Sequence, residues 1–381
     1  MIPYGKQSIN QDDKKAVLRA LSAEFITQGP RAAEFEAALA RYCGAKYVVV
    51  FSSATAGLHA ACAVAGLKAG DEAITSPISF AASANCILYQ GARVRFADVN
   101  ADSAQITAET VAPVISKKTK VVIPVDFTGR PVAIAPLFAL TQKKNLTLIV
   151  DAAHSLGATY SLRGREYRVG SCAHADMTVF SFHPVKSMTT AEGGAVTTNC
   201  KIHYERLLRF RQHGITKTQK DFVNPEFAKC GWYYEMQDLG YNYRLTDIQC
   251  ALGLSQLKRL ETFINKRRHI VDLYRDKLSG VVDFLSGDDN AFQSAHHLLP
   301  ILVEPKRREF IFNKLRAAGI GVHLHYLPIY RLPYYTKNLP ENFRNYPSAE
   351  SYFRRAITLP VFPDLKKRDQ DFVIKMVRKF S

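Results

Sequence analysis

The sequence predicts an α/β protein with a large domain, built on a mainly parallel seven-stranded sheet, and a smaller C-terminal α/β domain. Two observations predict this fold. First, short apolar segments alternate with helical ones from about residue 45 to 200, as in a parallel sheet covered on both faces. Second, the last hundred residues show strand and helix patterns of their own. We therefore expect residues 1–245 to form the large domain and residues 246–381 the small one.

Each expected strand of the large domain is a short, mostly apolar or β-branched run. These strands are Tyr47–Phe51, Glu72–Ser76, Arg93–Val99, Lys120–Phe127, Leu146–Ala153, Met177–Phe182 and Gly194–Thr198. The helices expected between them are Thr55–Gly66, Phe80–Tyr89, Ala108–Ser116 and Ala135–Lys144. An N-terminal helix is expected over Gln11–Ser22 and a charged one over Ile202–Gln212.

The small domain is expected to begin with a long helical segment. After a loop rich in Lys, Phe and Tyr, helical periodicity extends from Thr246 to Lys277. Two strands and three helices then follow: strands His296–Glu304 and Val322–Tyr326, and helices Arg307–Ala318, Ala349–Ala356 and Gln370–Phe380. We expect a cleft between the two domains.

Composition and charge narrow the class of protein. Among the 381 residues, 51 are basic and 34 acidic, which gives a net charge of +17. This excess suits either an anionic partner, such as a phosphate or sugar nucleotide, or general surface character. The basic residues are dispersed, and no aromatic-interleaved basic stripe accompanies them. We therefore expect no binding of nucleic acid.

The sequence also argues against a membrane span and against secretion. Residues 47–67 carry no acidic or basic group apart from His59, but Ser and Thr side chains interrupt the run after a β-branched strand. A buried strand followed by a buried helix explains this pattern better. The N-terminus shows no apolar signal region, and the seven cysteines lack metal-like spacing, so we expect reduced thiols in the cytoplasm and no metal site.

Three polar elements at the ends of expected strands carry the chemical signal. Asp151 directly follows a very apolar strand, where ligands dock on α/β sheets, although it would also serve as a helix N-cap. Lys186 follows the strand that ends at Ser181, although an ordinary surface lysine would fit the same place. The segment 52–57 offers a helix N-terminus to a phosphate, or simple N-capping.

Together, these three elements suit pyridoxal 5′-phosphate (PLP). The lysine would form a Schiff base, and the aspartate would keep the pyridine nitrogen protonated, which makes the ring an electron sink. The helix N-terminus would hold the phosphate. No GxGxxG, GxxxxGK[ST], HExxH or GxSxG motif supports another common chemistry.

The chain resembles the DegT/DnrJ/StrS family of sugar-nucleotide aminotransferases nearly from end to end. The matching stretches are IPYGKQSI (2–9), FITQGP (25–30), SSATAGLH (52–59), SPISFAASAN (76–85), DAAHSLGA (151–158), FSFHPVKSMTTAEGG (180–194), LGYNYRLTDIQCALGLSQL (239–257) and the segment around 323–330. The resemblance implies the type I fold of PLP enzymes. Ala54 and Ala191 stand where the family usually has glycine.

The resemblance also implies roles for individual residues. Lys186 and Asp151 match the catalytic lysine and the partner of the pyridine nitrogen. The other positions implied at the cofactor are Ala54, Thr55, Phe80, His154, Ser181 and Asn242, the last of these contributed by a second subunit. The positions implied at the sugar nucleotide are Tyr4, Ile26, Thr27, Gln28, Gly29, Ser53, Ser181, Asn242, His323, His325 and Tyr326, although core packing or turn formation would explain several of them.

Within the family, the resemblance is to the 4-aminotransferases of pseudaminic acid synthesis. It implies transfer of an amino group from L-glutamate to C4 of a UDP-4-keto-6-deoxy-N-acetylhexosamine. Three alternatives stay open at this point: another 4-keto or 3-keto sugar nucleotide as substrate, a PLP-fold sugar dehydratase, and a regulatory protein without catalysis. Dehydratases of the family replace the lysine with histidine, and a binding module needs no such lysine, so Lys186 disfavours both of the last two.

A homodimer with shared active sites is also expected. The type I fold implied by the resemblance places its sites at a subunit interface. Separately, residues 221–245 are unusually aromatic without clear periodicity, which suits an interface, although the rings would also suit the protein's own core.

Overall fold

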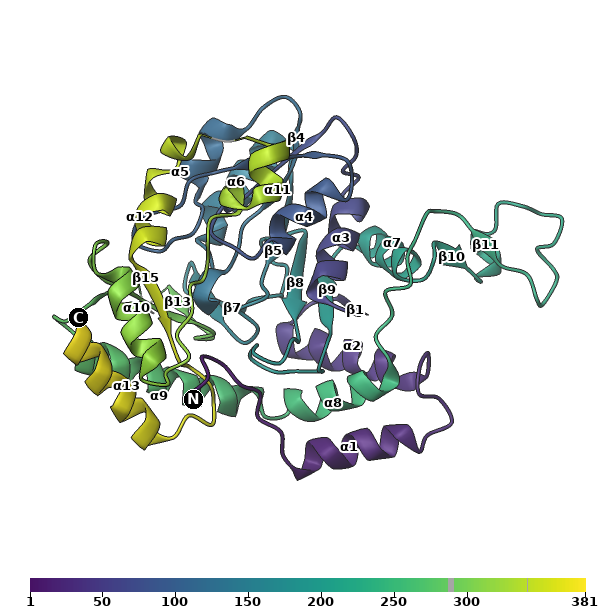
Figure 1. The fold of residues 1–381 in the computed structure, drawn as a ribbon. Helices are drawn as coiled ribbons and strands as arrows, with labels where there is room; N and C mark the ends of the chain where they lie inside the picture. The colour runs from purple at the N-terminus through teal and green to yellow at the C-terminus, as the bar shows by residue number, and fades with distance from the viewer. Residues whose placement is uncertain (287–290, 341) are drawn as a thin grey trace.

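The computed structural model describes residues 1–286, 291–340 and 342–381, and all seven strands expected in the large domain form one sheet (Figure 1). The strand order is β1-β9-β8-β5-β4-β2-β3. Strand β9 is antiparallel to both of its neighbours, and the remaining pairs are parallel. The bounds are β1 Tyr47–Phe51, β2 Glu72–Thr75, β3 Arg93–Phe96, β4 Thr119–Ile123, β5 Thr147–Asp151, β8 Met177–Ser181 and β9 Gly194–Thr198. The predicted mainly parallel sheet is confirmed.

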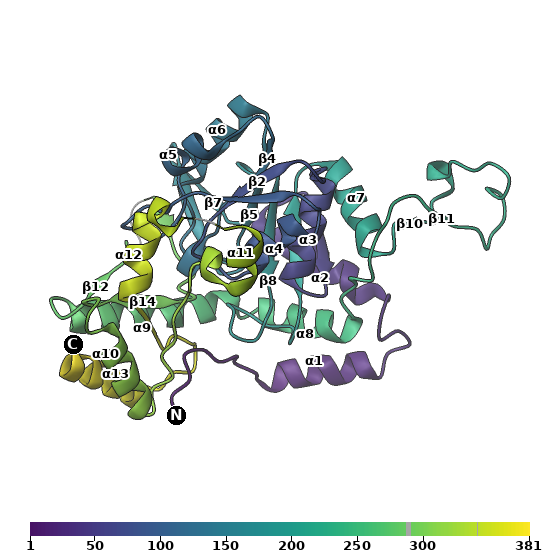
Figure 2. The ribbon, with the colours of Figure 1, turned by 45° about the horizontal axis from the view of Figure 1, so that its top comes forward.

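Helices cover this sheet. Helix α3 packs against β1, β5, β8 and β9, α4 against β2 and β3, and α6 against β5. Helix α1 lies along α8, as two views show (Figures 1 and 2). The bounds are α1 Gln11–Leu21, α2 Pro30–Cys43, α3 Ala54–Val64, α4 Ala82–Leu88, α5 Ala108–Val111, α6 Ile134–Lys144, α7 Lys201–Arg211 and α8 Asp247–Leu257.

The C-terminal part has its own sheet and its own hydrophobic core. Strand β14 (Leu299–Leu302) lies between β12 (Asp283–Phe284) and β15 (Ala356–Leu359). Helices α9 (Leu260–Leu278), α10 (Arg308–Ala317) and α13 (Lys367–Phe380) supply buried side chains to this core. The short α11 (Pro333–Asn338) and α12 (Pro347–Arg355) belong instead with the larger core. The division after residue 245 stays a prediction.

Several elements differ from the sequence-based expectation. Helix α2 was not expected, although Pro30 occupies its first turn. The expected helix over Thr246–Lys277 is two helices, which break at Lys258 and Arg259. The expected strand at Val322–Tyr326 forms only a bridge from His323 to Thr358, which lies in β15, a strand that was not expected.

Two further small sheets, one of three strands and one of two, complete the fold. Strands β6 (Thr159–Leu162), β7 (Arg165–Arg168) and β13 (Phe292–Gln293) pair beside the main sheet. Strands β10 (Ile215–Thr216) and β11 (Glu235–Met236) form the base of an arm, defined here as residues 215–240, that projects from the body (Figures 1 and 2). Exposed apolar side chains line this arm: Val223, Trp232, Tyr234, Met236 and Leu239.

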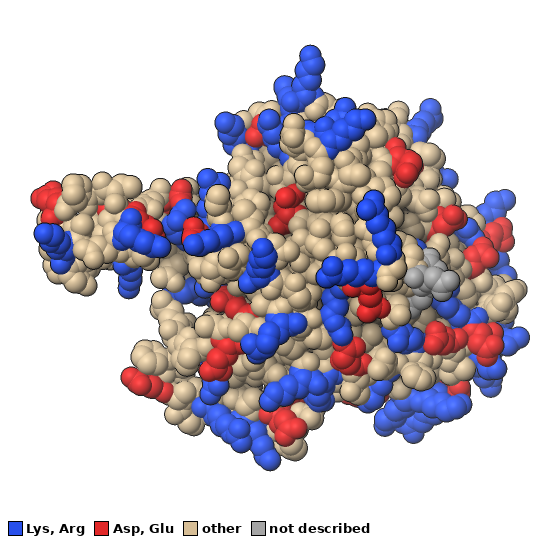
Figure 3. Space-filling view, turned by 180° about the vertical axis from the view of Figure 1, so that it is seen from behind, with Lys and Arg blue, Asp and Glu red and all other residues tan. Residues whose placement is uncertain are grey.

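The surface carries its basic residues in a dispersed pattern. On the face drawn in Figure 3, Lys and Arg are scattered among the acidic side chains rather than gathered in one stripe. Within the described residues, no helix has the length and apolar character that crossing a membrane requires.

Candidate active site

Asp151 is the last residue of β5, and its carboxylate is buried and held by two hydrogen bonds. Ser83 Oγ donates to Oδ2 at 2.6 Å, and the Ala153 N–H donates to Oδ1 at 3.1 Å. Burial raises the pKa of Asp151, while the two hydrogen bonds and the charge of Lys186 oppose this rise. The result is a fixed, desolvated carboxylate that is suited to share a proton with a nitrogen base.

Lys186 lies in the loop between β8 and β9, where its backbone N–H donates to the His183 carbonyl at 2.9 Å. Its Nζ lies 3.5 Å from Nε2 of His297. Burial of the amine lowers the pKa of Lys186 to about 8; Asp151 opposes this shift and Arg267 adds to it. A lysine with this pKa holds a useful neutral fraction near pH 7, and a neutral amine is the nucleophilic form.

Two buried histidines lie beside this amine. The rings of His154 and His297 are 4.5 Å apart between centroids, and His154 Nε2 lies 3.3 Å from the Tyr326 hydroxyl. Burial lowers the pKa of both histidines well below the usual value, so both are neutral. Gly129 (φ +101°) permits their approach, because a side chain there would lie 2.9 Å from the His154 carbonyl oxygen and from the His297 nitrogen.

The pocket contains buried polar atoms that the chain itself does not satisfy. Within the described part of the chain, Nδ1 of His154 and Nδ1 of His297 have no hydrogen-bond partner. An unsatisfied buried polar atom costs about 1–3 kcal/mol. This cost fits a pocket that holds a polar group, and the residues present suit the ring of PLP, with Asp151 for its nitrogen and Lys186 for its aldehyde.

The predicted phosphate cradle comes together at the start of α3. Ser53 caps this helix by accepting the Ala56 N–H at 3.1 Å, and the earlier N–H groups of a helix have no intrahelical acceptor. Ser181 pairs with Gly194 across β8 and β9. A side chain at Gly194 would lie 2.5 Å from the Ala54 nitrogen, so this glycine allows the start of β9 to lie against the start of α3. Ala54, Thr55 and Ser181 therefore belong to one end of the sheet.

The residues predicted for the sugar nucleotide divide into two groups. Tyr4 lies against His323 and His325, with ring centroids 5.6 and 5.1 Å apart, and Tyr326 lies near Phe80 at 6.4 Å. Because Tyr326 also contacts His154, this first group borders the Lys186 pocket. Phe80 is 63% exposed, so its ring next to Tyr326 is open to solvent.

The second group, Ile26–Gly29, is anchored elsewhere. The Gly29 N–H donates to the Asp247 carboxylate at 2.8 Å, and the Ile26 carbonyl accepts the Asp247 N–H at 3.1 Å. Ile26, Thr27 and Gln28 are exposed, and Gln28 has a left-handed backbone (φ +57°). The structure thus ties this segment to the start of α8, and its contact with a substrate stays a prediction.

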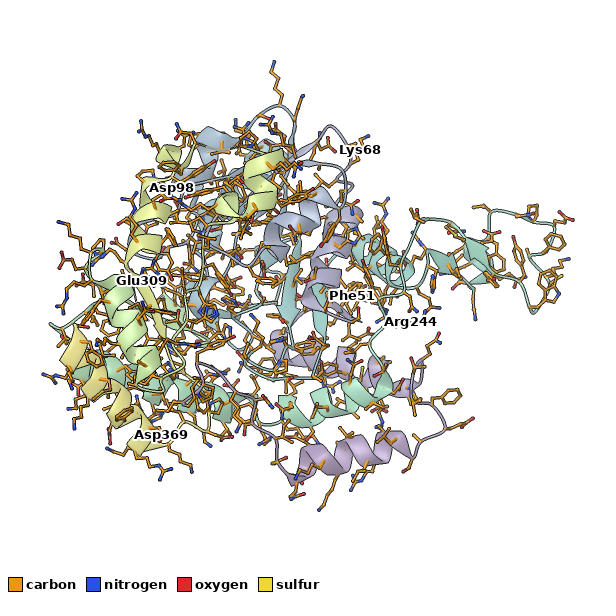
Figure 4. The ribbon with its side chains drawn as sticks, viewed as in Figure 1. Phe51, Lys68, Asp98, Arg244, Glu309 and Asp369 are labelled. Carbon is orange, nitrogen blue, oxygen red and sulfur yellow. The ribbon has the colours of Figure 1, made fainter. Side chains whose placement is uncertain are left out.

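Asn242 is exposed at the base of the arm. The neighbouring Tyr243 carbonyl accepts the Ser52 N–H at 2.8 Å, which brings this segment beside the end of β1. Figure 4 shows the adjacent labelled residues, Phe51 and Arg244, near each other there. Tyr241 and Tyr243 flank Asn242, with stacked rings 5.0 Å apart.

Three residues of the site were not found by sequence reasoning. Ser83 lies within the stretch SPISFAASAN, where only Phe80 was singled out, and its hydroxyl is a signal that was available. His297 adjoins an apolar strand and gave no motif. Arg267 occupies the apolar face of α9, and a single arginine on such a face is a usable signal.

The comparisons with known proteins agree with this geometry. The sequence profile of the DegT/DnrJ/EryC1/StrS aminotransferase family matches residues 7–378. A UDP-4-amino-4,6-dideoxy-N-acetyl-β-L-altrosamine transaminase from Campylobacter jejuni is 37% identical, over 98% of this chain and 96% of its own.

Two solved structures share the fold over nearly their whole length. The Helicobacter pylori aminotransferase PseC, described as involved in the biosynthesis of pseudaminic acid, has a TM-score of 0.90 and 33% identity, covering 100% of this chain and 98% of its own. The PLP form of a putative sugar aminotransferase from Streptococcus pneumoniae has a TM-score of 0.90 and 30% identity, with the same coverage.

The type I fold, with an aspartate at the end of β5 and a lysine in the loop after the neighbouring β8, is that of a PLP-dependent enzyme. Within that class, this chain belongs to the DegT/DnrJ/EryC1/StrS aminotransferase family and is a sugar aminotransferase.

Proposed function

We propose that the protein transfers the amino group of L-glutamate to C4 of a UDP-4-keto-6-deoxy-N-acetylhexosamine. The specific substrate we propose is UDP-2-acetamido-2,6-dideoxy-β-L-arabino-hex-4-ulose, and the pathway is pseudaminic acid biosynthesis. Family membership gives the reaction class, and the altrosamine transaminase relative supports this choice of sugar. The basic surface suits the diphosphate of a UDP carrier.

The observation that carries the proposal is the amine of Lys186, withdrawn from water beside Asp151, with its pKa lowered to about 8. When bound, PLP supplies an electrophilic carbon for an amine and a ring that accepts electrons. Lys186 would bind that carbon and later move a proton as general base and acid. Asp151 would hold a proton on the ring nitrogen.

The neighbouring residues would place and enclose the reactants. His154 and Phe80 would border the ring, and the start of α3 with Ser181 would hold the phosphate through backbone N–H groups and a hydroxyl. Tyr4, His323, His325 and Tyr326 would line the path of the sugar. The rings of this last group pack against one another, which supports such a wall.

We also propose a homodimer in which Asn242 of one subunit reaches the cofactor phosphate of the other. The exposed apolar side chains of the arm support a covering partner, because isolated chains rarely display so many together. The segment of Asn242 lies beside the start of α3 in its own chain. The seven cysteines are all free thiols, which supports a cytoplasmic location.

The decisive test is turnover of defined substrates. The PLP-loaded protein is incubated with the proposed UDP-4-ketosugar and L-glutamate, and NMR identifies the product and the position of its amine. We expect an amine at C4 of a single configuration, together with one molecule of 2-oxoglutarate for each amine formed. Turnover only with a different ketosugar, such as a 3-ketosugar that gives an amine at C3, would contradict the proposed substrate but leave the family assignment intact.

A further inference from the structure

Arg267 is a buried, charged residue on an apolar helix face in the C-terminal half of the chain. It lies on the buried face of α9 among Phe263, Ile264, Ile270 and Val271, and only 1% of its surface is exposed. In the part of the chain that the structure describes, no carboxylate forms an ion pair with it. Burying an unpaired guanidinium is expensive, since even a paired buried charge barely repays its desolvation. Packing alone therefore does not explain an arginine here.

Among the residues that the structure describes, the guanidinium donates to backbone carbonyls alone, and these come from three segments. Nη2 lies 3.3 Å from the Val185 oxygen and 3.2 Å from the Lys186 oxygen. Nη1 lies 2.9 Å from the Val361 oxygen and 3.4 Å from the His297 oxygen. The planar fork of an arginine holds several acceptors in one fixed arrangement, which an ammonium does not.

Two of these carbonyls belong to the residues whose side chains meet in the pocket. Lys186 Nζ and His297 Nε2 are 3.5 Å apart, and His297 is neutral because burial lowers its pKa. A neutral imidazole whose Nε2 lacks a proton accepts a hydrogen bond from an amine. The contact thus orients the lysine without taking its proton.

We infer that Arg267 is a positioning residue for amino-group transfer: by holding the backbones of Lys186 and His297 together, it keeps the amine aimed into the pocket. His297 is the acceptor that fixes the direction of Nζ. This inference rests on the proposed role of Lys186. It concerns this chain's own residues, so it can be tested before any substrate is turned over.

Charge supports the same arrangement. The charged groups that act on Lys186 are Asp151 from β5 and Arg267 from α9, and the imidazoles of His154, His297 and His325 lie near it as neutral groups. Desolvation lowers the pKa of Arg267 only to about 10, so it stays a cation at neutral pH and disfavours protonation of the lysine. Loss of this cation should therefore raise the pKa of Lys186.

The experiment measures how fast the protein without cofactor captures PLP. The PLP is trapped on the protein with borohydride at a series of pH values, and mass spectrometry quantifies the modified Lys186 peptide. Wild type should show a rate that rises with a midpoint near pH 8. Arg267→Met should move the midpoint upward and slow capture at pH 7.5 by about tenfold, the factor that one pKa unit represents. Arg267→Lys should keep the midpoint but still capture severalfold more slowly, because it keeps the charge and loses the fork.

A second pair of variants tests the acceptor. His297→Leu should slow capture, and His297→Gln should restore much of it, because a glutamine oxygen can also accept from the amine. The matched control is Arg275→Met, a variant of another α9 arginine that donates to the Leu285 carbonyl at 2.9 Å. It should lower only the thermal midpoint.

The possible results distinguish the positioning role of Arg267 and His297 from the proposed role of Lys186. Wild-type capture in both folded Arg267 variants, or in folded Arg267→Lys where Arg267→Met does not fold, would overturn the positioning role. Wild-type capture in His297→Leu would overturn the role of the imidazole. Capture of PLP by a different lysine in the wild-type protein would instead refute the proposed role of Lys186. Normal capture without turnover of the ketosugar would refute only the proposed substrate.

Discussion

The two halves of the candidate site are built differently. The inner half, around Asp151, Lys186 and His297, is closed by contacts of 3.5 Å or less that one chain supplies. The outer half consists of exposed groups, with Phe80 63% and Ile26 51% exposed, and Asn242 on the surface. One chain therefore holds the groups of the inner half in place, whereas the groups of the outer half are exposed and free to contact a substrate or a second chain. The predictions below probe this difference, from the largest effect to the smallest.

The inner half should fail completely without its amine. Lys186→Ala should abolish covalent capture of PLP, the visible absorbance of the loaded protein and all transamination, because no other group there forms the bond. Absorbance and product NMR measure these losses. Lys68→Ala, at an exposed lysine after α3, is the control and should behave as wild type. Wild-type turnover in Lys186→Ala would show that the reactive amine lies elsewhere.

The carboxylate of the inner half should matter for its charge rather than its shape. Asp151→Asn should retain PLP but lower kcat on the order of 10²–10⁴-fold, because an amide holds no proton on the ring nitrogen. The control is Asp126→Asn, which changes another buried acid, in the segment after β4, whose carboxylate accepts the Ser155 hydroxyl and the Val132 N–H. It should lower stability while leaving kcat nearly unchanged. Near-normal kcat in Asp151→Asn would remove the proton-holding role.

The outer half should be repairable by a second chain. Lys186→Ala and Asn242→Ala subunits are each expected to be inactive alone. A mixed dimer would carry one site with both defects and one with neither, so an equal mixture should regain about a quarter of wild-type activity by random pairing. Size measurement and subunit exchange confirm that mixed dimers form. A monomer at working concentration, or no recovery after proven exchange, argues that the site is not shared.

The close approach at Gly194 should tolerate no side chain. Gly194→Ala would press its methyl against the Ala54 nitrogen, 2.5 Å away, and should destabilise the protein by about 1–3 kcal/mol and weaken PLP binding. Denaturant unfolding and PLP titration measure both effects. Gly231→Ala, where nothing lies within 4 Å, is the control. Equal behaviour of the two variants would mean that the start of α3 moves freely.

The smallest effect concerns the loop after Lys186. Ala191 stands where the family usually has glycine, and its backbone is left-handed (φ +68°). Ala191→Gly should relieve this strain, but the net stabilisation should be only about 0.5–1 kcal/mol because the added freedom of the unfolded state offsets part of the relief. Thermal unfolding measures the change. A loss of stability would show that the Cβ of Ala191 contributes packing that exceeds the strain.

The sheet and the inner site were predictable because local chemistry specifies them. A β-branched run such as Tyr47–Phe51 indicates a strand that is buried on both faces. An acid at the end of an apolar strand, such as Asp151, is expected at the edge of the sheet where ligands bind. What escaped prediction depends on distant partners. Lys258 and Arg259 break a helical pattern that contains no Pro and whose Gly253 lies inside α8, and Arg259 there pairs with Asp13 of α1. The strand β15 was hidden because it directly follows α12.

The histidine segment shows the same limit. Val322–Tyr326 alternates like a strand, yet β14 pairs with β15 instead and leaves the segment as part of a wall against Tyr4. The local sequence does not show whether such a segment pairs as a strand or packs its aromatic rings against another segment. Arg267 and His297 likewise contact Lys186 only because the Lys186 loop packs against them, and the local sequence does not show this packing.

The contacts of Val361 have a consequence for synthesis. Its carbonyl accepts from Arg267, and its N–H donates to the carbonyl of Tyr4, near the other end of the sequence. The surroundings of Lys186 thus join an early-synthesised segment, at Tyr4, to one made much later, at Val361. The sheet can assemble as the chain emerges, but the support of Lys186 cannot be completed until residue 361 has left the exit tunnel. A nascent chain would therefore form the main sheet well before the amine of Lys186 is held in its final position.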